Sequence, residues 1–247
     1  MTNKRVVVTG ASSGIGAAAV RALRKTGWDV VAVARREDRL KELAEETGAR
    51  IIACDVTDRQ SVDAMAREVL ADGGVDAIVN NAGGAFGMDP VAAGNPEDWV
   101  RMYNVNVLGA LNVTQAFLPA LRENGEGSIL MLTSTAALAA YEGGAGYCAA
   151  KAGEQAMTQA LRLEEAEHNV RVIEILPGMV KTEEFSLNRL GDAAAAEKIY
   201  AGVEKPLTAE DVADVMAYAL NAPHHVNLDQ VVIRPVAQAA QHKVIRR

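Results

Sequence analysis

Short runs of β-branched and other apolar residues alternate along the chain with longer segments whose apolar residues recur every three or four positions. The short runs predict β-strands, and the periodic segments predict amphipathic helices. The predicted strands are residues 5–9, 29–34, 50–54, 75–80, 128–133, 170–176 and 230–234. The predicted helices are residues 14–27, 37–48, 58–72, 96–124, 146–168 and 208–221.

The predicted strands carry no polar alternation, which is typical of strands buried on both faces. Because helices join them, we predict an α/β fold: a single doubly wound Rossmann-type domain over 1–247, with a seven-stranded parallel sheet and helices on both faces. Gly27, Gly48 and Asn221 stand where helices of this pattern are expected to end. Ligands of such folds bind at the carboxyl ends of the strands.

The periodicity lapses over residues 181–207, the one long stretch that the pattern predicts to be irregular. A long segment of this kind in a compact domain often serves as a lid or binding loop. We therefore expect a substrate-binding loop at about 181–207.

Composition narrows the classes of function. The 247 residues carry a net charge of −7, which argues against a nucleic-acid or anionic-membrane binder. No apolar segment is long enough for a signal peptide or a membrane span, so we expect a cytoplasmic protein. Cys54 and Cys148 are too few for a disulfide framework or zinc site, and we expect buried free thiols and no metal. The histidines at 168, 224, 225 and 242 show no ligand spacing and are expected at the surface.

A glycine-rich turn, TGASSGIG at 9–16, follows the first predicted strand and opens the first predicted helix. Gly10, Gly14 and Gly16 allow a tight turn and a close approach of the backbone to a pyrophosphate. The pyrophosphate would lie on the helix N-terminus, where unpaired N–H groups favour an anion. A purely structural glycine turn is the alternative.

Two arginines end the second predicted strand, where the choice between the two nicotinamide dinucleotides is made. An acidic residue there would bind the ribose hydroxyls of NAD, whereas arginine accommodates the 2′-phosphate of NADP. Arg35 and Arg36 occupy this point, so the sequence favours NADP. The alternative is that both arginines are solvated surface charges.

A tyrosine and a lysine stand four residues apart in GYCAAKAG at 146–153. In a helix Tyr147 and Lys151 lie on the same face, one turn apart. An ammonium beside a phenol favours the phenolate, and a phenol of that kind can exchange protons in a reaction.

Nearly the whole chain resembles the short-chain dehydrogenase/reductase family. The glycine pattern, the Asp55-Val56 pair, NNAG at 80–83, NVNVLG around Asn106, LTS ending at Ser134, YCAAK and PGMVKT at 177–182 match the family in order and spacing. Ser134 lies 13 residues before Tyr147, as the family pattern requires.

The resemblance implies an oxidoreductase with four catalytic residues. Tyr147 is the acid/base that exchanges a proton with the substrate oxygen, and Lys151 supports it and hydrogen-bonds the nicotinamide ribose. Ser134 donates to the substrate oxygen, and Asn106 holds a water in a relay from Lys151 to solvent. The residue pattern alone also allows Asn106 to be a helix-interior polar residue bonded to its own backbone, and Asn81 to be a turn-forming asparagine.

The same resemblance implies the set of residues that contact NADP. They are Gly10, Ser12, Ser13, Gly14, Ile15, Gly16, Arg35, Arg36, Asp55, Val56, Asn81, Tyr147, Lys151, Pro177, Val180 and Thr182.

Within the family the chain most resembles NADP-dependent 3-hydroxy acid dehydrogenases acting on serine and allo-threonine, through NNAGGAFGMDP, YEGGAGYCAAK, EEFSLNRLGD and HVNLDQVVIRPV. We therefore expect Ser134, Tyr147 and Arg189 to bind the substrate, with Arg189 holding its carboxylate. Lys181 and the segment GDAAAAEK depart from that pattern in the region expected to bind the substrate. The resemblance also implies a homotetramer.

Two other functions remain open from the sequence. One is reduction of another carbonyl, such as a 3-oxoacyl thioester or a xenobiotic ketone. The other is a non-catalytic dinucleotide sensor, which the complete set of Ser134, Tyr147 and Lys151 argues against.

Overall fold

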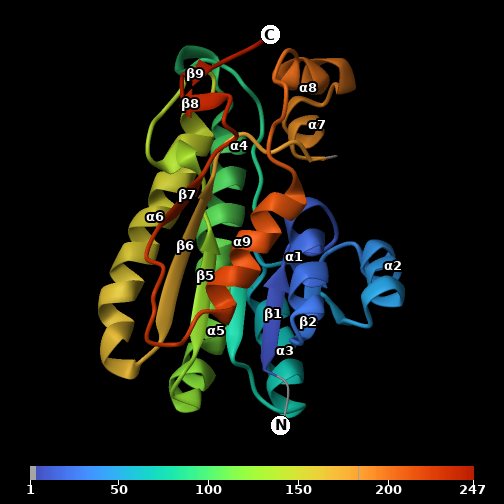
Figure 1. Ribbon diagram of the computed structural model, residues 1–247, viewed down its shortest axis with the longest axis vertical. Coiled ribbons are helices and arrows are strands. Elements are labelled where there is room, and N and C mark those ends of the chain that lie inside the picture. Colours follow the sequence, from blue (N-terminus) through green and yellow to red (C-terminus); the bar gives the residue numbers. More distant parts are fainter. Residues whose placement is uncertain (1–3, 183) are drawn as a thin grey trace.

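A computed structural model describes residues 4–182 and 184–247 of the chain. Seven parallel strands form one sheet in the order β3-β2-β1-β4-β5-β6-β7, which confirms the predicted doubly wound sheet (Figure 1). The strands are β1 (Arg5–Thr9), β2 (Asp29–Ala34), β3 (Arg50–Ala53), β4 (Ala77–Asn80), β5 (Ser128–Leu132), β6 (Arg171–Pro177) and β7 (Val231–Ile233). The strand order reverses between β1 and β4, and ligand sites of doubly wound sheets lie at such a point.

Helices cover both faces of the sheet. They are α1 (Gly14–Lys25), α2 (Glu37–Thr47), α3 (Arg59–Ala71), α4 (Pro96–Tyr103), α5 (Gly109–Asn124), α6 (Ala145–Glu165), α7 (Phe185–Leu190), α8 (Ala193–Tyr200) and α9 (Ala209–Asn221). The apolar sides of α1, α2 and α9 pack on one face of the sheet, and those of α3, α5 and α6 pack on the other. Strand residues alternate between these two cores, which explains why the strands are apolar throughout.

The predicted helix at 96–124 is interrupted rather than uniform. A π-helical turn over Asn104–Leu108 separates α4 from α5, and within it Gly109 N–H bonds the carbonyl of Asn104, five residues back. Such turns insert one extra residue and often mark functional sites. The apolar spacing of the segment cannot reveal the turn, because the helix continues on both sides of it.

About half of the segment 181–207 is helical, so the prediction of an irregular stretch is wrong over α7 and α8. Gly191 ends α7 in the left-handed conformation, with φ +66°. Asp192 then caps α8 by accepting from Ala194 N–H and Ala195 N–H. Both signals lie in the sequence, but α7 and α8 are too short to produce a helical apolar period.

The helix ends expected at Gly48 and Asn221 are confirmed, because Gly48 caps α2 with φ +68° and Asn221 is the last residue of α9. A short antiparallel hairpin, β8 (Gln238–Ala240) with β9 (Lys243–Val244), was not predicted. This hairpin, α7 and α8 all lie at the end of the molecule toward which the strands point (Figure 1). No helix among the described residues is long and apolar enough to cross a membrane.

Candidate functional site

A cleft of about 1130 Å³ opens at the carboxyl ends of the strands. Every predicted cofactor and substrate residue lines it: Gly10, Ser12, Ser13, Gly14, Ile15, Gly16, Arg35, Arg36, Asp55, Val56, Asn81, Ser134, Tyr147, Lys151, Pro177, Val180, Thr182 and Arg189. Residues up to 179 positions apart in the sequence thus meet in one place. Asn106, which was predicted to be catalytic, does not line the cleft, because its side chain is fully buried.

The glycine turn is held by close contacts that exclude side chains. Gly10 has φ +66°, and a Cβ on Gly16 would lie 2.2 Å from the carbonyl oxygen of Gly10. Asn81 braces this turn, because its Nδ2 donates to the carbonyls of Thr9 and Gly10 at 2.8 and 3.2 Å. Asn81 is therefore more than a turn former, since its amide fixes the loop that faces the cleft.

The N-terminus of α1 opens into the cleft without a side-chain cap. Ser13 is the N-cap residue, but its hydroxyl makes no bond to the first-turn N–H groups and donates to Glu184 at 2.8 Å instead. The first turn contains no acidic residue. These N–H groups and the helix dipole together favour an anion at this point.

Arg36 does not point freely into solvent. It makes a two-pronged ion pair with Glu184, at 2.7 and 2.8 Å, and donates to the hydroxyls of Ser12 and Ser13 at 3.0 Å. Glu184 is the N-cap residue of α7, so the pair joins the end of β2 to that helix. The Arg36 guanidinium lowers the pKa of Glu184. Arg35 is exposed at the rim and makes no hydrogen bond to the described residues.

The remaining rim residues are held by the backbone around them. Asp55 accepts from the N–H and hydroxyl of Thr57 at 2.9 and 2.8 Å, which forms a tight turn after β3. Val180 forms a bridge with Leu207, so the chain after β6 is fixed at the point where it leaves the sheet. Thr182 stands against Gly14, where its methyl carbon lies 3.5 Å from the position of a Cβ.

Ser134 follows β5 and starts a short 3₁₀ turn over Thr135–Ala137. Its Oγ accepts from Ala136 N–H at 3.1 Å. This bond fixes the oxygen and leaves the hydroxyl proton available to donate into the cleft. The geometry therefore suits a hydrogen-bond donor to a substrate oxygen.

Tyr147 and Lys151 lie one turn apart on α6, and both are buried. The Tyr147 ring packs edge-on against Phe185 of α7, with centroids 5.8 Å apart. Its hydroxyl makes no hydrogen bond to any residue in the described part of the chain. The Lys151 ammonium donates to the carbonyl of Leu132 at 2.9 Å and to the carboxylate of Glu154 at 2.6 Å. One of its three N–H donors remains for a ligand or for Tyr147.

Asn106 lies in the π-helical turn and bonds only to the main chain. Its Nδ2 donates to the carbonyls of Met102 and Gly84, at 2.7 and 2.9 Å, and its Oδ1 accepts from Gly84 N–H at 3.2 Å. The bond to the Met102 carbonyl, four residues back, is the bond to its own helix that the sequence allowed. Both amide donors are used, so a water could be held only by Oδ1 or by a main-chain group.

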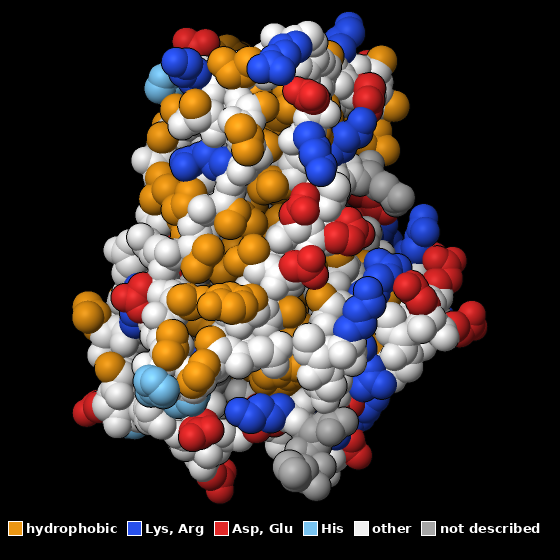
Figure 2. All heavy atoms as spheres, viewed as in Figure 1, with side chains coloured by type: hydrophobic (Ala, Val, Ile, Leu, Met, Phe, Trp, Pro, Cys, Tyr) orange, Lys and Arg blue, Asp and Glu red, His pale blue; other side chains and the backbone are white. Residues whose placement is uncertain are grey.

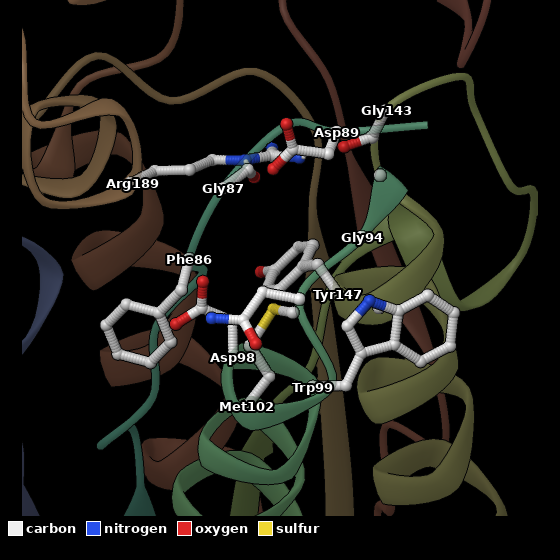
Figure 3. A pocket seen from close by; sticks show the side chains of 13 residues that line it. Phe86, Gly87, Asp89, Gly94, Asp98, Trp99, Met102, Gly143, Tyr147 and Arg189 are labelled. Carbon is white, nitrogen blue, oxygen red and sulfur yellow. Dashed lines mark hydrogen bonds between the residues drawn. The ribbon is translucent and has the colours of Figure 1, made fainter. Parts of the chain in front are cut away.

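Arg189 of α7 closes one end of the cleft. Its side chain crosses above Tyr147, with the guanidinium carbon 5.9 Å from the centre of that ring (Figure 3). It donates to the carbonyls of Gly87 and Gly143 and to the hydroxyl of Tyr141, at 3.0, 3.1 and 2.8 Å. Arg189 is only 9% exposed, yet none of the described carboxylates lies within ion-pair distance of it.

Sequence reasoning missed four residues that shape this site: Tyr141, Glu154, Glu184 and Phe185. Glu154 is visible in hindsight, because it stands three residues after Lys151 on the predicted helix. The other three come from segments with no helical period or from a loop. Cys54 and Cys148 are buried free cysteines, as predicted, and burial raises the pKa of both thiols.

Comparison with known proteins agrees with this geometry. The chain is 52% identical to an uncharacterized oxidoreductase of Mycobacterium tuberculosis, over 97% of this chain and 94% of that protein. It is 41% identical to sulfoacetaldehyde reductase 2 of Chromohalobacter salexigens, over 95% of each chain. The closed form of a serine dehydrogenase complexed with NADP+ superimposes with a TM-score of 0.93, at 37% identity over 98% of this chain and 99% of that one.

The sequence profile described as short chain dehydrogenase matches residues 4–190. That range contains the glycine turn, Ser134, Tyr147, Lys151 and Arg189, all of which line the cleft. The chain therefore belongs to the short chain dehydrogenase family of oxidoreductases.

Proposed function

We propose that this protein transfers a hydride between NADP(H) and the hydroxyl or carbonyl carbon of a small substrate with an anionic group. The preferred substrate is a 3-hydroxy acid such as serine or allo-threonine, or the corresponding semialdehyde. The observation that carries this proposal is Arg189, a buried guanidinium beside Tyr147 with no carboxylate partner among the described residues. Asp89 and Asp98 line the same pocket, but neither forms an ion pair with the guanidinium (Figure 3). A buried guanidinium without a direct ion-pair partner is costly, so an anionic ligand at this place would be favoured.

The hydrogen bonds of Arg189 leave room for such a ligand. A guanidinium has five N–H donors, and three of them bond Gly87, Tyr141 and Gly143. The remaining two lie on its two terminal nitrogens, which is the arrangement that binds both oxygens of a carboxylate. The three internal bonds hold the guanidinium in place before the ligand arrives.

The other cations of residues 181–207 are poorer candidates. Lys181 pairs with Glu197 at 2.8 Å. Lys198 and Lys205 are exposed. Only Arg189 combines burial with a position next to Tyr147.

The cleft fits NADP. The uncapped N-terminus of α1 and the close-packed glycine turn suit a pyrophosphate, with Asn81 bracing the turn. Arg36 and Ser13 already donate to the carboxylate of Glu184, so these donors can hold an anion. The 2′-phosphate would take Arg36 from Glu184. The serine dehydrogenase that this chain resembles was solved with NADP+, which supports the same cofactor.

NADP supplies the acceptor or donor of the hydride, and the protein handles the proton. In the oxidation direction Ser134 donates a hydrogen bond to the substrate oxygen and positions it. Tyr147 takes the hydroxyl proton as the hydride leaves the same carbon. Lys151 supplies positive charge that favours the phenolate of Tyr147. Arg189 holds the anionic end and so fixes which carbon faces the cofactor.

A second candidate substrate is sulfoacetaldehyde. Its carbonyl and sulfonate are separated by one carbon, as are the hydroxyl carbon and carboxylate of a 3-hydroxy acid. A guanidinium binds either anion, and a relative 41% identical over 95% of this chain is named sulfoacetaldehyde reductase 2. Serine differs in carrying an ammonium group between the two ends. Xenobiotic ketones and 3-oxoacyl thioesters are less favoured, because a neutral group would leave Arg189 unpaired.

We also propose that the protein is a homotetramer. Two separate surfaces expose large apolar side chains: Val100, Tyr103 and Leu108 on α4 and the π-helical turn, and Tyr218, Val232 and Val236 on α9, β7 and the chain after it. Figure 2 shows hydrophobic side chains gathered on the side where β7 runs. A tetramer with dihedral symmetry uses more than one self-complementary interface, which two such surfaces can provide.

Tyr147→Phe is expected to lower turnover by about two to four orders of magnitude, because it removes the ionisable oxygen but keeps the ring against Phe185. Binding of NADP, measured by calorimetry, should change little. Tyr103→Phe, at an exposed position on α4, is the control. Retention of a tenth or more of the activity by Tyr147→Phe would exclude the proposed acid/base role.

The unmodified protein is expected to prefer NADP to NAD by at least about a hundredfold in kcat/KM, because two charged hydrogen bonds to the 2′-phosphate are available. Replacing Arg35 and Arg36 together with alanine should remove most of that preference by weakening NADP alone. Arg39→Ala, in the first turn of α2, is the matched control. Equal use of both cofactors by the unmodified protein would contradict the assignment.

Arg189→Ala is expected to raise the KM for an anionic substrate by about tenfold or more, because it removes two charge-assisted hydrogen bonds. The assay follows reduced nicotinamide absorbance with serine, allo-threonine and 2-hydroxyethanesulfonate, the alcohol of sulfoacetaldehyde. Lys198→Ala is the control. An unchanged KM would show that Arg189 does not hold the anion, and the substrate with the highest kcat/KM would decide between carboxylate and sulfonate.

Sedimentation of the purified protein is expected to give a tetramer. Tyr218→Asp with Val232→Asp should convert it to dimers, because burying these charges on the α9–β7 surface is costly. A monomer for the unmodified chain would contradict the proposal.

A further inference from the structure

The buried face of α6 carries an unusual run of polar residues. Tyr147, Lys151, Glu154 and Thr158 are spaced by four, three and four, so they form one stripe along the helix. All four are buried, with Glu154 and Thr158 at most 1% exposed. The upper part of this stripe is the proposed acid/base pair, but Glu154 has no part in the mechanism described so far.

Glu154 contacts the lysine of that pair directly. Its carboxylate accepts from the Lys151 ammonium at 2.6 Å, and the two side chains are 1% and 5% exposed. Both groups are thus removed from water, and a buried charge pair interacts more strongly than one at the surface. The carbonyl of Leu132 takes a second Lys151 proton. These two bonds fix the direction of the Lys151 side chain.

The charged and titratable groups that act on this pair and on Tyr147 come from several elements. Glu174 faces the pair from β6, and Tyr147 lies on α6 itself. Arg189 of α7, bonded to the hydroxyl of Tyr141, lies over the Tyr147 ring and acts equally with and without Glu154. Glu174 accepts from Thr133, Gln155 and Gln230, at 2.7, 3.3 and 2.9 Å. Burial, opposed by the attraction of Lys151, raises the pKa of Glu154 to about 7. Burial lowers the pKa of Lys151, but the attraction of Glu154 and Tyr147 outweighs it, and that pKa lies above its usual value.

We propose that Glu154 is a positioning residue for the acid/base pair: its carboxylate fixes the Lys151 ammonium and, through its negative charge, opposes ionisation of Tyr147. The inference rests on the proposed role of Tyr147. With Glu154 ionised beside Lys151, the net charge of the pair is near zero, so the positive field of Lys151 at the Tyr147 hydroxyl is largely cancelled.

The size of this effect follows from the helix. Glu154 lies seven residues after Tyr147, so their Cα atoms are about 10 Å apart along the helix axis, which sets the order of magnitude of the distance between the two side chains. A unit charge at that distance, in the effective dielectric of a protein, moves a titration by about one pH unit. Tyrosine side chains ionise in the basic pH range, where Glu154 already carries its charge. That charge is therefore present over the pH range in which a tyrosine loses its proton.

The test is Glu154→Gln, which removes the charge and keeps an acceptor for Lys151. The first measurement is the pH profile of kcat/KM for oxidation by the full-length protein. The second is the tyrosinate absorbance of the protein without cofactor, taken as the difference between each background and the same background with Tyr147→Phe. We expect both midpoints to move about one pH unit toward acid.

Two variants separate this role from a structural one. Glu165→Gln removes a buried carboxylate from the same helix, where it pairs with Arg122, and should leave both midpoints in place. Glu154→Asp keeps the charge and should restore the midpoints even if activity falls. If Glu154→Gln does not fold, Glu154→Met removes the same charge with a side chain of similar length.

The outcomes are distinct. Unchanged midpoints in the folded charge-removing variant would overturn the inference. A shift in Glu154→Asp as large as that in Glu154→Gln would also overturn it. Activity retained by Tyr147→Phe would instead overturn the proposed function. The tyrosinate measurement needs no substrate, so it decides on Glu154 even if the preferred substrate differs from those assayed.

Discussion

The buried ammonium of Lys151 is the charge around which the site is arranged. It is 4% exposed, and a charge removed from water must be compensated nearby. Glu154 supplies the counter-charge, Leu132 a carbonyl, and Tyr147 lies one turn above. Because β5 carries Leu132 and ends two residues before Ser134, the strand that accepts from Lys151 also places the residue proposed to contact the substrate oxygen. The position of β5 therefore helps to set the geometry of the proposed acid/base pair.

Lys151, Arg36 and Arg189, three cations proposed to act in the cleft, are compensated differently, and that difference matches their proposed roles. Lys151 has a permanent buried partner in Glu154 and can act on Tyr147 without leaving it. Arg36 has an exchangeable partner, because its side chain is 43% exposed and Glu184 can be replaced by another anion. Arg189 has three neutral hydrogen-bond partners and no described carboxylate, so its counter-charge is left to the ligand.

The sequence predicts the sheet and the residues that line the cleft because both rest on local patterns. Apolar strands, the glycine turn and the Tyr147-Lys151 spacing are each contained in a few consecutive positions. The ion pair between Arg36 and Glu184 spans 148 residues and depends on how α7 folds back over the cleft. The π-helical turn leaves the apolar period of its helix intact. Such features depend on tertiary packing, so no local pattern predicts them.

The short helix α7 contacts several parts of the site that lie far apart in the sequence. Its N-cap residue Glu184 binds the arginine proposed to select NADP, and its first residue Phe185 packs on Tyr147, the proposed acid/base. Four residues later, Arg189 bonds Gly87 and Gly143 and faces the same ring. A helix of six residues cannot move one of these contacts without the others. An anion that takes Arg36 from Glu184 therefore removes one anchor of α7, while an anion bound to Arg189 adds one at its other end.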